Sequence, residues 1–209
     1  MIIKHRRRFL TLAATGTVLA TVPGIANATE TLTPEQTAGP FYPRSLPVDH
    51  DADLVQIKSH GARALGTITY LQGHVGTPAG NPIRGARVEI WQCDSFGRYH
   101  HPRDGGGQDP GFQGFGRTET DTQGRYRFRT IRPVPYPGRA PHIHMRIVSG
   151  GVDMTTQIYI EGDPLNAKDF LLGRISDPLA RASLIVPFQA INGFEAGALK
   201  AEFNPVILA

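Results

Sequence analysis

The sequence of 209 residues has little of several features that would indicate other classes of protein. It contains one cysteine, Cys93, so no disulfide can form within the chain. Its stability must come from its core, from bound metal or from oligomerisation. No internal repeat and no heptad pattern is visible, which excludes solenoids and coiled coils. Its apolar runs are also shorter than the roughly 20 residues that a transmembrane helix needs.

The first 28 residues have the pattern of a signal peptide. A basic stretch, Lys4 to Arg8, precedes an uncharged run from Thr11 to Val22, and small residues stand at Ala26 and Ala28, where a signal peptidase reads. Three arginines followed by Phe9 and Leu10 give the leader a twin-arginine character. We predict cleavage after Ala28, a periplasmic or secreted protein and no stable membrane anchor afterwards. Retention of the leader as an anchor is the less favoured alternative.

The chain has no net charge once this leader is set aside. The full chain has 22 Lys and Arg against 18 Asp and Glu, and the leader holds four of the cations and no acid, which leaves 18 against 18. The basic pI therefore belongs mostly to the leader and gives no support for nucleic-acid binding. Residues 29–209 are enough for one domain with a full core.

What the sequence has in abundance is turns. Its 24 glycines and 17 prolines separate short apolar segments, several of which alternate with period two, as Arg125 to Arg129 do. This pattern predicts an all-β fold, an antiparallel β-sandwich with long loops and few short helices. The expected strands are Leu65–Leu71, Ala86–Trp91, Gly124–Ile131, Ile143–Val148, Thr155–Ile160, Leu184–Ile191 and Leu199–Leu208.

Between these strands we expect little helix. Asp163-Pro164 and Asp177-Pro178 are each expected to start a short helical turn. Residues 29–60 form an N-terminal arm and residues 61–209 the sandwich domain. The glycine-rich stretch 102–116 is longer than most loops of compact domains, so it is a candidate functional loop.

The strongest local signal for chemistry is Pro141-His142-Ile143-His144. On a strand, side chains two residues apart point to the same face, so both imidazoles can reach one ion. Taken alone, such a pair is more often ordinary strand surface. Upstream, Tyr136 stands between two prolines that restrict its backbone, as suits a ligand but equally a structural tyrosine. Tyr99 follows a strand at the start of the long loop.

Two tyrosines and two histidines together would suit a particular kind of ion. A phenol has a pKa near 10, so it binds at neutral pH to a strong Lewis acid that displaces its proton. A hard trivalent ion favours anionic oxygen. Ferric iron, Fe(3+), therefore fits Tyr99, Tyr136, His142 and His144 better than zinc or copper does. Four protein ligands leave one or two positions for substrate and solvent.

These segments resemble the intradiol ring-cleavage dioxygenases. The likeness is greater to the iron-binding subunit of protocatechuate 3,4-dioxygenase than to catechol 1,2-dioxygenase, and it runs from about Thr37 to Pro164. Its markers, in chain order, are Thr37 to Pro40, Gly85 to Gln92, Gly97 to Tyr99, Thr120 to Thr130, Pro135 to Pro137, Pro141 to His144 and Thr156 to Pro164.

The resemblance implies a role for each of these residues. Tyr99 and His142 would be equatorial ligands of the iron, and Tyr136 and His144 axial ones. A catechol-type substrate would displace Tyr136, which helps to take up a proton. Arg139 would steady the substrate and the developing charge, and Gln157 would line the pocket. The reaction implied is cleavage by O2 between the two hydroxylated carbons, giving a cis,cis-muconate-type diacid.

The sequence departs from the family pattern near Tyr136. Only six positions separate Tyr136 from His142, and Gly138 stands where protocatechuate enzymes carry a tryptophan. Residues that bind the substrate carboxylate there have no convincing counterpart, and a homo-oligomer is one possible assembly. The alternative function is a non-catalytic exported β-sandwich module that binds a metal or an aromatic compound. Trp91 is expected to be a core residue, and Cys93 a small, partly buried residue and not a nucleophile.

Overall fold

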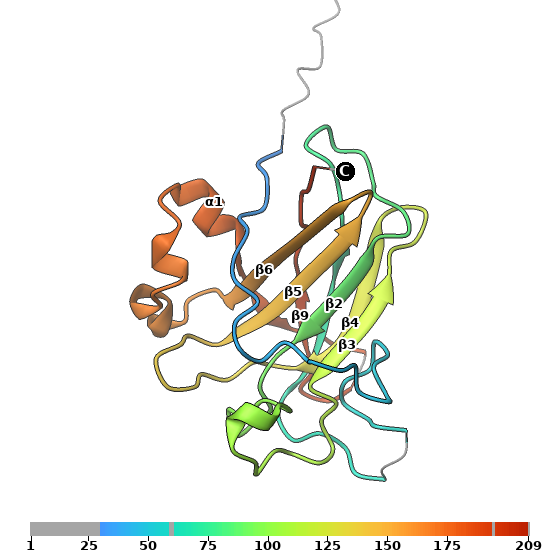
Figure 1. The fold of residues 1–209 in the computed structure, drawn as a ribbon, viewed down its shortest axis with the longest axis vertical. Helices are drawn as coiled ribbons and strands as arrows, with labels where there is room; N and C mark the ends of the chain where they lie inside the picture. The colour runs from blue at the N-terminus through green and yellow to red at the C-terminus, as the bar shows by residue number, and fades with distance from the viewer. Residues whose placement is uncertain (1–29, 59–60, 194, 209) are drawn as a thin grey trace, which may run out of the picture.

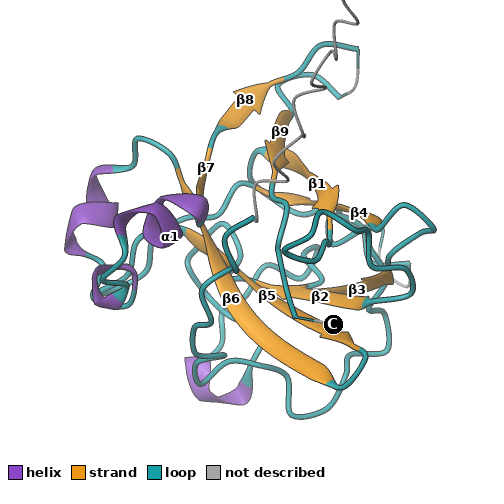
Figure 2. Cartoon of the chain, turned by 90° about the horizontal axis from the view of Figure 1, so that it is seen from above, coloured by secondary structure: helices purple, strands orange, loops and turns teal. Residues whose placement is uncertain are grey.

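Two β-sheets pack face to face in the computed structural model, which describes residues 30–58, 61–193 and 195–208 (Figure 1; Figure 2). The predicted leader, residues 1–28, lies outside the described residues and stays a prediction. One sheet has the strand order β4-β1-β9-β8 and the other β3-β2-β5-β6-β7. The strands are β1 (Ile68–His74), β2 (Arg87–Trp91), β3 (Phe115–Glu119), β4 (Arg125–Ile131), β5 (His142–Ser149), β6 (Val152–Ile160), β7 (Ile185–Val186), β8 (Phe188–Ala190) and β9 (Leu199–Glu202).

The predicted all-β sandwich is confirmed. Pairing is antiparallel between β1 and β4 and from β3 through β2 and β5 to β6, whereas β1–β9 and β6–β7 are parallel, so each sheet is mixed. The alternation in β4 has the predicted sense, because Tyr126 and Phe128 are buried while Arg125 and Arg127 are exposed. The main core lies between the sheets and includes Leu71, Val88, Phe128, Ile143 and Ile158.

Several strand boundaries differ from the expected ones. Strand β3 was not predicted, because Gly116 interrupts its pattern. A Cβ at that glycine would lie 2.4 Å from Leu54 Cδ1, so the close approach of the N-terminal arm requires it. The single strand expected over Leu184–Ile191 is divided at Pro187, which has no backbone N–H for a ladder. Strand β9 ends at Glu202, well before the expected Leu208.

The few helices are short, as predicted. The 3₁₀ helix η2 (Pro164–Lys168) starts at Asp163, and α1 (Pro178–Ser183) starts at Asp177; each aspartate side chain caps its first turn. The other 3₁₀ helices are η1 (Pro102–Asp104) and η3 (Leu172–Arg174). Within the ranges described, no helix has the length and apolar character needed to cross a membrane.

The N-terminal arm runs across the outer face of the five-stranded sheet, where it appears in blue (Figure 1). Gln36 donates its backbone N–H to Thr155 O of β6, and His50 O accepts one from Arg117 of β3. Leu54 reaches the main core, with no exposed surface. The arm therefore covers the sheet face that carries the two histidines of β5.

Candidate metal centre

The four predicted ligands meet at one end of the five-stranded sheet. Tyr99 comes from the loop after β2, Tyr136 from the loop between β4 and β5, and both histidines from β5. His142 Nε2 lies 3.2 Å from His144 Nε2 and 3.4 Å from Tyr99 Oη. The rings of Tyr99 and Tyr136 meet edge to face, 5.6 Å apart. One small space is thus faced by two phenols and two imidazoles.

The strand pairing explains the position of each histidine. Ile143 points into the main core, so its neighbours His142 and His144 point the opposite way, toward the arm. His142 Nδ1 lies 2.7 Å from Ala140 O, and a proton held there leaves the Nε2 lone pair directed at the centre. His144 is stacked on Trp91, its partner across β2, with ring centroids 4.8 Å apart and an interplanar angle of 4°.

Trp91 is buried, as expected, but its surroundings differ from the prediction. It belongs to a second, smaller apolar cluster with Cys93, Tyr99 and Phe115, beside the candidate centre and apart from the main core. Cys93 is buried and its pKa is raised to about 12, first by burial, so the thiol stays protonated. This agrees with a structural role for Cys93.

The long loop after β2 fixes Tyr99. Asp104 accepts the Tyr99 backbone N–H, and the Gln108 amide donates to Tyr99 O at 3.0 Å. Phe41 of the arm stacks on the phenol ring, with centroids 4.5 Å apart. The stretch 102–116 therefore contributes hydrogen bonds that hold a candidate ligand.

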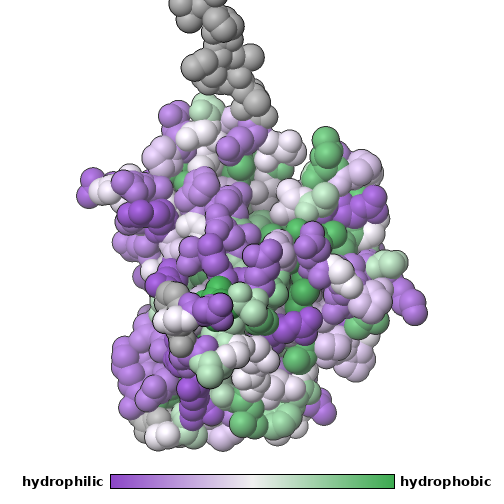
Figure 3. All heavy atoms as spheres, turned by 180° about the vertical axis from the view of Figure 1, so that it is seen from behind, coloured by the Kyte–Doolittle hydropathy of each residue, from purple (hydrophilic) through white to green (hydrophobic). Residues whose placement is uncertain are grey.

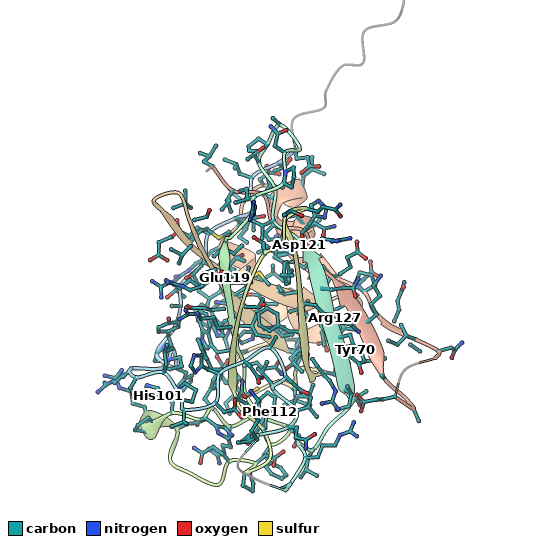
Figure 4. All side chains as sticks on the ribbon, turned by 90° about the vertical axis from the view of Figure 1, so that its right-hand side faces the viewer. Tyr70, His101, Phe112, Glu119, Asp121 and Arg127 are labelled. Carbon is teal, nitrogen blue, oxygen red and sulfur yellow. The ribbon has the colours of Figure 1, made fainter. Side chains whose placement is uncertain are left out.

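His100 and His101 lie in the same loop but outside the candidate centre. His101 accepts the Arg103 backbone N–H through Nδ1 and contacts the ring of Phe41. His100 packs edge-on against Phe112. Figure 4 shows His101 and Phe112 at the same end of the sandwich, opposite Glu119 and Asp121. Both histidines are therefore loop residues that pack against aromatic rings.

Arg139 and Gln157, the other two predicted site residues, are in direct contact. Arg139 Nη2 donates to Gln157 Oε1 at 2.5 Å, and Nη1 lies 3.4 Å from Tyr136 Oη. Gln157 of β6 is paired with His144 of β5, so the strand register places the two side chains next to each other on the same face of the sheet. Its amide also donates to Thr37 O of the arm at 3.0 Å.

Sequence reasoning missed three residues that complete this surrounding. Asp169 accepts from Arg139 Nε at 2.8 Å, Tyr159 Oη lies 3.2 Å from Arg139 Nη2, and Phe41 covers Tyr99. For Tyr159, period-two spacing from Gln157 was an available signal. Asp169 and Phe41 had none, because they reach the site from separate loops.

Burial moves the pKa values of all four candidate ligands toward their neutral forms. The pKa of His142 is lowered to about 4, by burial and by the nearby Arg139 charge. That of His144 is lowered well below its usual value, mainly by burial, and burial raises the pKa values of Tyr99 and Tyr136. In the absence of a bound cation the phenols hold their protons and the imidazoles are neutral at pH 7.

These residues fit a ferric ion. His142 Nε2 and His144 Nε2 face each other at 3.2 Å. Each imidazole is neutral and can direct a lone pair at the same point, so the two nitrogens are suited to bind one cation. The parts of the chain that the structure describes contain no group of three or more His, Cys, Asp or Glu with metal-binding geometry. A complete ligand set here therefore needs the phenols of Tyr99 and Tyr136, which favour a hard trivalent ion.

A cavity opens beside Tyr136 and Arg139. Its volume is about 330 Å³, and apolar side chains together with Lys168 and Asp169 form much of its lining. A Cβ added at Gly138 would meet no atom within 4 Å, so this side of the cavity is open. The cavity adjoins the two groups that were expected to act on a substrate, Tyr136 and Arg139, and Tyr99 does not line it. It is the candidate substrate cleft.

Comparison with known proteins agrees with this architecture. The sequence model of a family described as Dioxygenase matches residues 37–207. The chain is 38% identical over 172 residues to the protocatechuate 3,4-dioxygenase beta chain of Burkholderia cepacia, which covers 77% of this chain and 72% of that one. It is 30% identical over 198 residues to hydroxyquinol 1,2-dioxygenase of Corynebacterium glutamicum, spanning 84% of this chain but only 62% of that relative.

Solved structures share the fold. The dioxygenase domain of a dioxygenase carbohydrate-binding protein fusion from Streptomyces sp. SirexAA-E has a TM-score of 0.64 and 28% identity, covering 85% of this chain and 98% of that one. An intradiol ring-cleavage dioxygenase from Tetranychus urticae has a TM-score of 0.65 at 22% identity, covering 84% and 94%. The second likeness concerns the fold alone.

Proposed function

This chain belongs to the intradiol ring-cleavage dioxygenase family, and we propose that it uses ferric iron and O2 to cleave a catechol-type ring between its hydroxylated carbons. The product would be a cis,cis-muconate-type diacid. The carrying observation is the convergence of Tyr99, Tyr136, His142 and His144, with His142 Nε2 within 3.4 Å of both Tyr99 Oη and His144 Nε2.

In this proposal the two histidines and Tyr99 keep the ion in place throughout. His142 and His144 are neutral at pH 7, because burial lowers the pKa of each imidazole, and both are available as nitrogen ligands. Ferric iron held by these residues would supply the Lewis acidity that favours the phenolate forms and activates a catechol-type substrate toward O2. The stacked rings of Trp91 and Phe41 limit movement of His144 and Tyr99.

Tyr136 and Arg139 act on the substrate. Tyr136 borders the cleft, so its Oη can leave the ligand set and accept a proton from an incoming catechol hydroxyl. Arg139 Nη1, 3.4 Å from that oxygen, stabilises negative charge on the phenolate or on the substrate that replaces it. Gln157 accepts a hydrogen bond from Nη2 of Arg139, which keeps Nη2 directed away from the cleft and leaves Nη1 on the substrate side.

The first test is colour and oxygen uptake. Purified protein loaded with iron should absorb visible light through tyrosinate-to-iron charge transfer, and catechol should shift that band. Oxygen consumption should then follow with at least one of catechol, protocatechuate, hydroxyquinol or a substituted catechol. A protein that stays colourless after anaerobic iron loading and consumes no oxygen with any of them would contradict the proposal.

The alternative is an exported module that binds a metal or an aromatic compound without catalysis. It predicts the iron colour and a catechol-induced shift, but no oxygen uptake. The twin-arginine leader remains a separate proposal, supported by residues 1–28 of the sequence. Its test is the location of the full-length protein in cells when the arginine pair at positions 6 and 7 is replaced by lysines.

A further inference from the structure

Arg139 is anchored by a carboxylate that no sequence motif indicated. Arg139 is 8% exposed, and its guanidinium contacts five side chains around the candidate centre. Four of them are neutral partners, namely Tyr136, His142, Gln157 and Tyr159. The fifth is Asp169, which accepts from Nε at 2.8 Å and is the one carboxylate that pairs with Arg139 among the residues described.

Asp169 is itself held rigidly. Its Oδ2 also accepts the Ala140 backbone N–H at 2.9 Å, and its Oδ1 accepts those of Leu171 and Leu172, each at 3.0 Å. The side chain has no exposed surface. Four donors on two oxygens leave the carboxylate no freedom to rotate. The orientation of the guanidinium is therefore determined by a turn of backbone that follows η2.

The same carboxylate also reaches the ligand strand. Ala140 donates its N–H to Asp169, and its carbonyl oxygen lies 2.7 Å from His142 Nδ1. Asp169 thus contacts both Arg139, which faces the substrate, and Ala140, whose carbonyl oxygen contacts the candidate ligand His142. Leaving Arg139 without this partner would place an unpaired cation in a buried site.

We propose that Asp169 is a positioning residue for the reaction: it holds Arg139 so that Nη1 faces Tyr136 Oη and the substrate. This inference rests on the proposed function. It differs from a general structural role because the chemistry should suffer more than folding or iron binding. Misplacement of a charged group by about 1 Å can cost on the order of 100-fold in rate.

The test compares Asp169→Asn with Asp163→Asn. Both aspartates accept the backbone N–H of the residue two positions ahead at 3.0 Å, but Asp163 makes no contact with Arg139. With iron loaded, Asp169→Asn should lower kcat by about 10- to 100-fold while iron content and the visible band persist. Asp163→Asn should retain the wild-type kcat. Equal kcat values in the two variants would overturn the proposal.

A second measurement does not depend on activity. In iron-free protein, the Nε proton of Arg139 should be shifted downfield and protected from exchange in ¹H–¹⁵N spectra. That signal should be lost in Asp169→Asn and kept in Asp163→Asn. If it is unprotected in the wild type, Asp169 is not the anchor. Absence of oxygen uptake in the wild type would instead contradict the proposed function, whatever these spectra show.

Two further variants cover the case in which Asp169→Asn fails to fold. Asp169→Glu keeps the charge one methylene further out and should recover part of kcat. In an Arg139→Lys background, which has no Nε–H to anchor, Asp169→Glu should cause no additional loss. An equal loss in both backgrounds would show that Asp169 acts through stability and not through Arg139.

The candidate substrate cleft carries a second, independent inference. Arg139 and Asp169 neutralise each other at its wall, whereas Lys168 lines it with no ion pair among the described residues. No other lining side chain is charged, so the cleft has a net positive charge. We infer that the cleft takes a catechol whose ring bears an anionic substituent such as a carboxylate, with Lys168 as the counter-ion; this too rests on the proposed function.

The ratio of kcat/KM for protocatechuate to that for catechol tests this inference. Lys168→Ala should lower the ratio by about 5-fold at low salt, Lys168→Arg should preserve it, and added salt should shrink the effect. Lys200→Ala is the control, because Lys200 pairs with Glu202 on β9. An unchanged ratio in Lys168→Ala would overturn the inference. Failure of the wild type to cleave either compound would instead count against the proposed function.

Discussion

Two polar clusters of this protein are built in opposite ways. The surface arginine cluster, made of Asp53, Tyr70, Arg129 and Glu195, lies on the four-stranded sheet. Arg129 donates to both oxygens of Glu195, at 2.6 and 2.9 Å, and to Asp53 at 2.9 Å. Tyr70 Oη donates to Glu195 at 2.8 Å. Figure 3 shows that the side of the molecule facing away from the viewer in Figure 1 is largely hydrophilic. Figure 4 shows Tyr70 near Arg127.

The candidate centre has the opposite character. Tyr99 and both histidines are buried, and Tyr136 is partly buried. No opposite charges meet among these four groups, and His142 Nε2 and His144 Nε2 face each other at 3.2 Å. In the surface cluster each charge meets an opposite charge, so that cluster is complete by itself. The difference teaches that burial combined with like groups marks a ligand site, whereas a dense network of ion pairs marks structure.

The largest effect expected from this comparison is on activity. Tyr136→Phe or His144→Ala should reduce oxygen uptake by more than about 100-fold with every catechol, because each removes a proposed ligand of the metal. Glu195→Gln, in the surface cluster, should leave oxygen uptake at the wild-type level. Wild-type activity in either site variant would show that the centre is misassigned.

Metal removal should separate the clusters by stability. If ferric iron binds the folded centre as proposed, at about 1,000 times its Kd it should add about 4 kcal/mol to the free energy of unfolding. Chelation should lower Tm, and restored iron should raise it again, in wild type and in Glu195→Gln alike. Scanning calorimetry measures both. A Tm that is insensitive to iron in the wild type would contradict the centre.

A smaller loss of stability is expected from the surface cluster itself. Arg129→Met should lower the free energy of unfolding by about 1 kcal/mol, because its ion pairs are partly exposed to water. Salt should reduce the difference between variant and wild type, as measured by urea unfolding at two ionic strengths. A loss that does not respond to salt would indicate that packing of the Arg129 stem is responsible.

The smallest effect is a dependence on pH. Hydrogen bonds from Arg129 lower the pKa of Glu195 from 4.5 to about 2. The folded state therefore keeps this carboxylate charged where the unfolded state protonates it. Its stabilising contribution is complete above about pH 4.5 and is lost as the pH falls toward 2. Glu195→Gln should flatten the stability curve in that window. An unchanged slope would mean that other carboxylates dominate.

Some of the fold could be read from local pattern. Alternation placed β4 correctly, and the Asp-Pro pairs marked the starts of η2 and α1. Strand β3 could not be predicted, because Gly116 is explained by contact with Leu54, far away in the sequence. The parallel pairing of β1 with β9 also joins distant segments, and no local signal encodes it.

The candidate centre, too, could be predicted only in part from local pattern. Period two put His142 and His144 on one face of β5, and family motifs singled out Tyr99, Tyr136, Arg139 and Gln157. Their meeting in one space depends on register, because the pairing of β5 with β6 puts Gln157 beside His144 and Tyr159 beside His142. Asp169 carried no signal, since an aspartate after a short helix is an ordinary cap until its partner is known.

By itself, then, the sequence determined the family, the all-β class and the candidate ligands, because these depend on residue types and on spacing along one strand. The tertiary structure alone decided which loops surround those ligands. It brought Phe41 onto Tyr99 and Asp169 onto Arg139 from segments far apart in the chain. The physical reason is that burial and charge pairing depend on all the neighbours of a group, and most of those neighbours are distant in sequence.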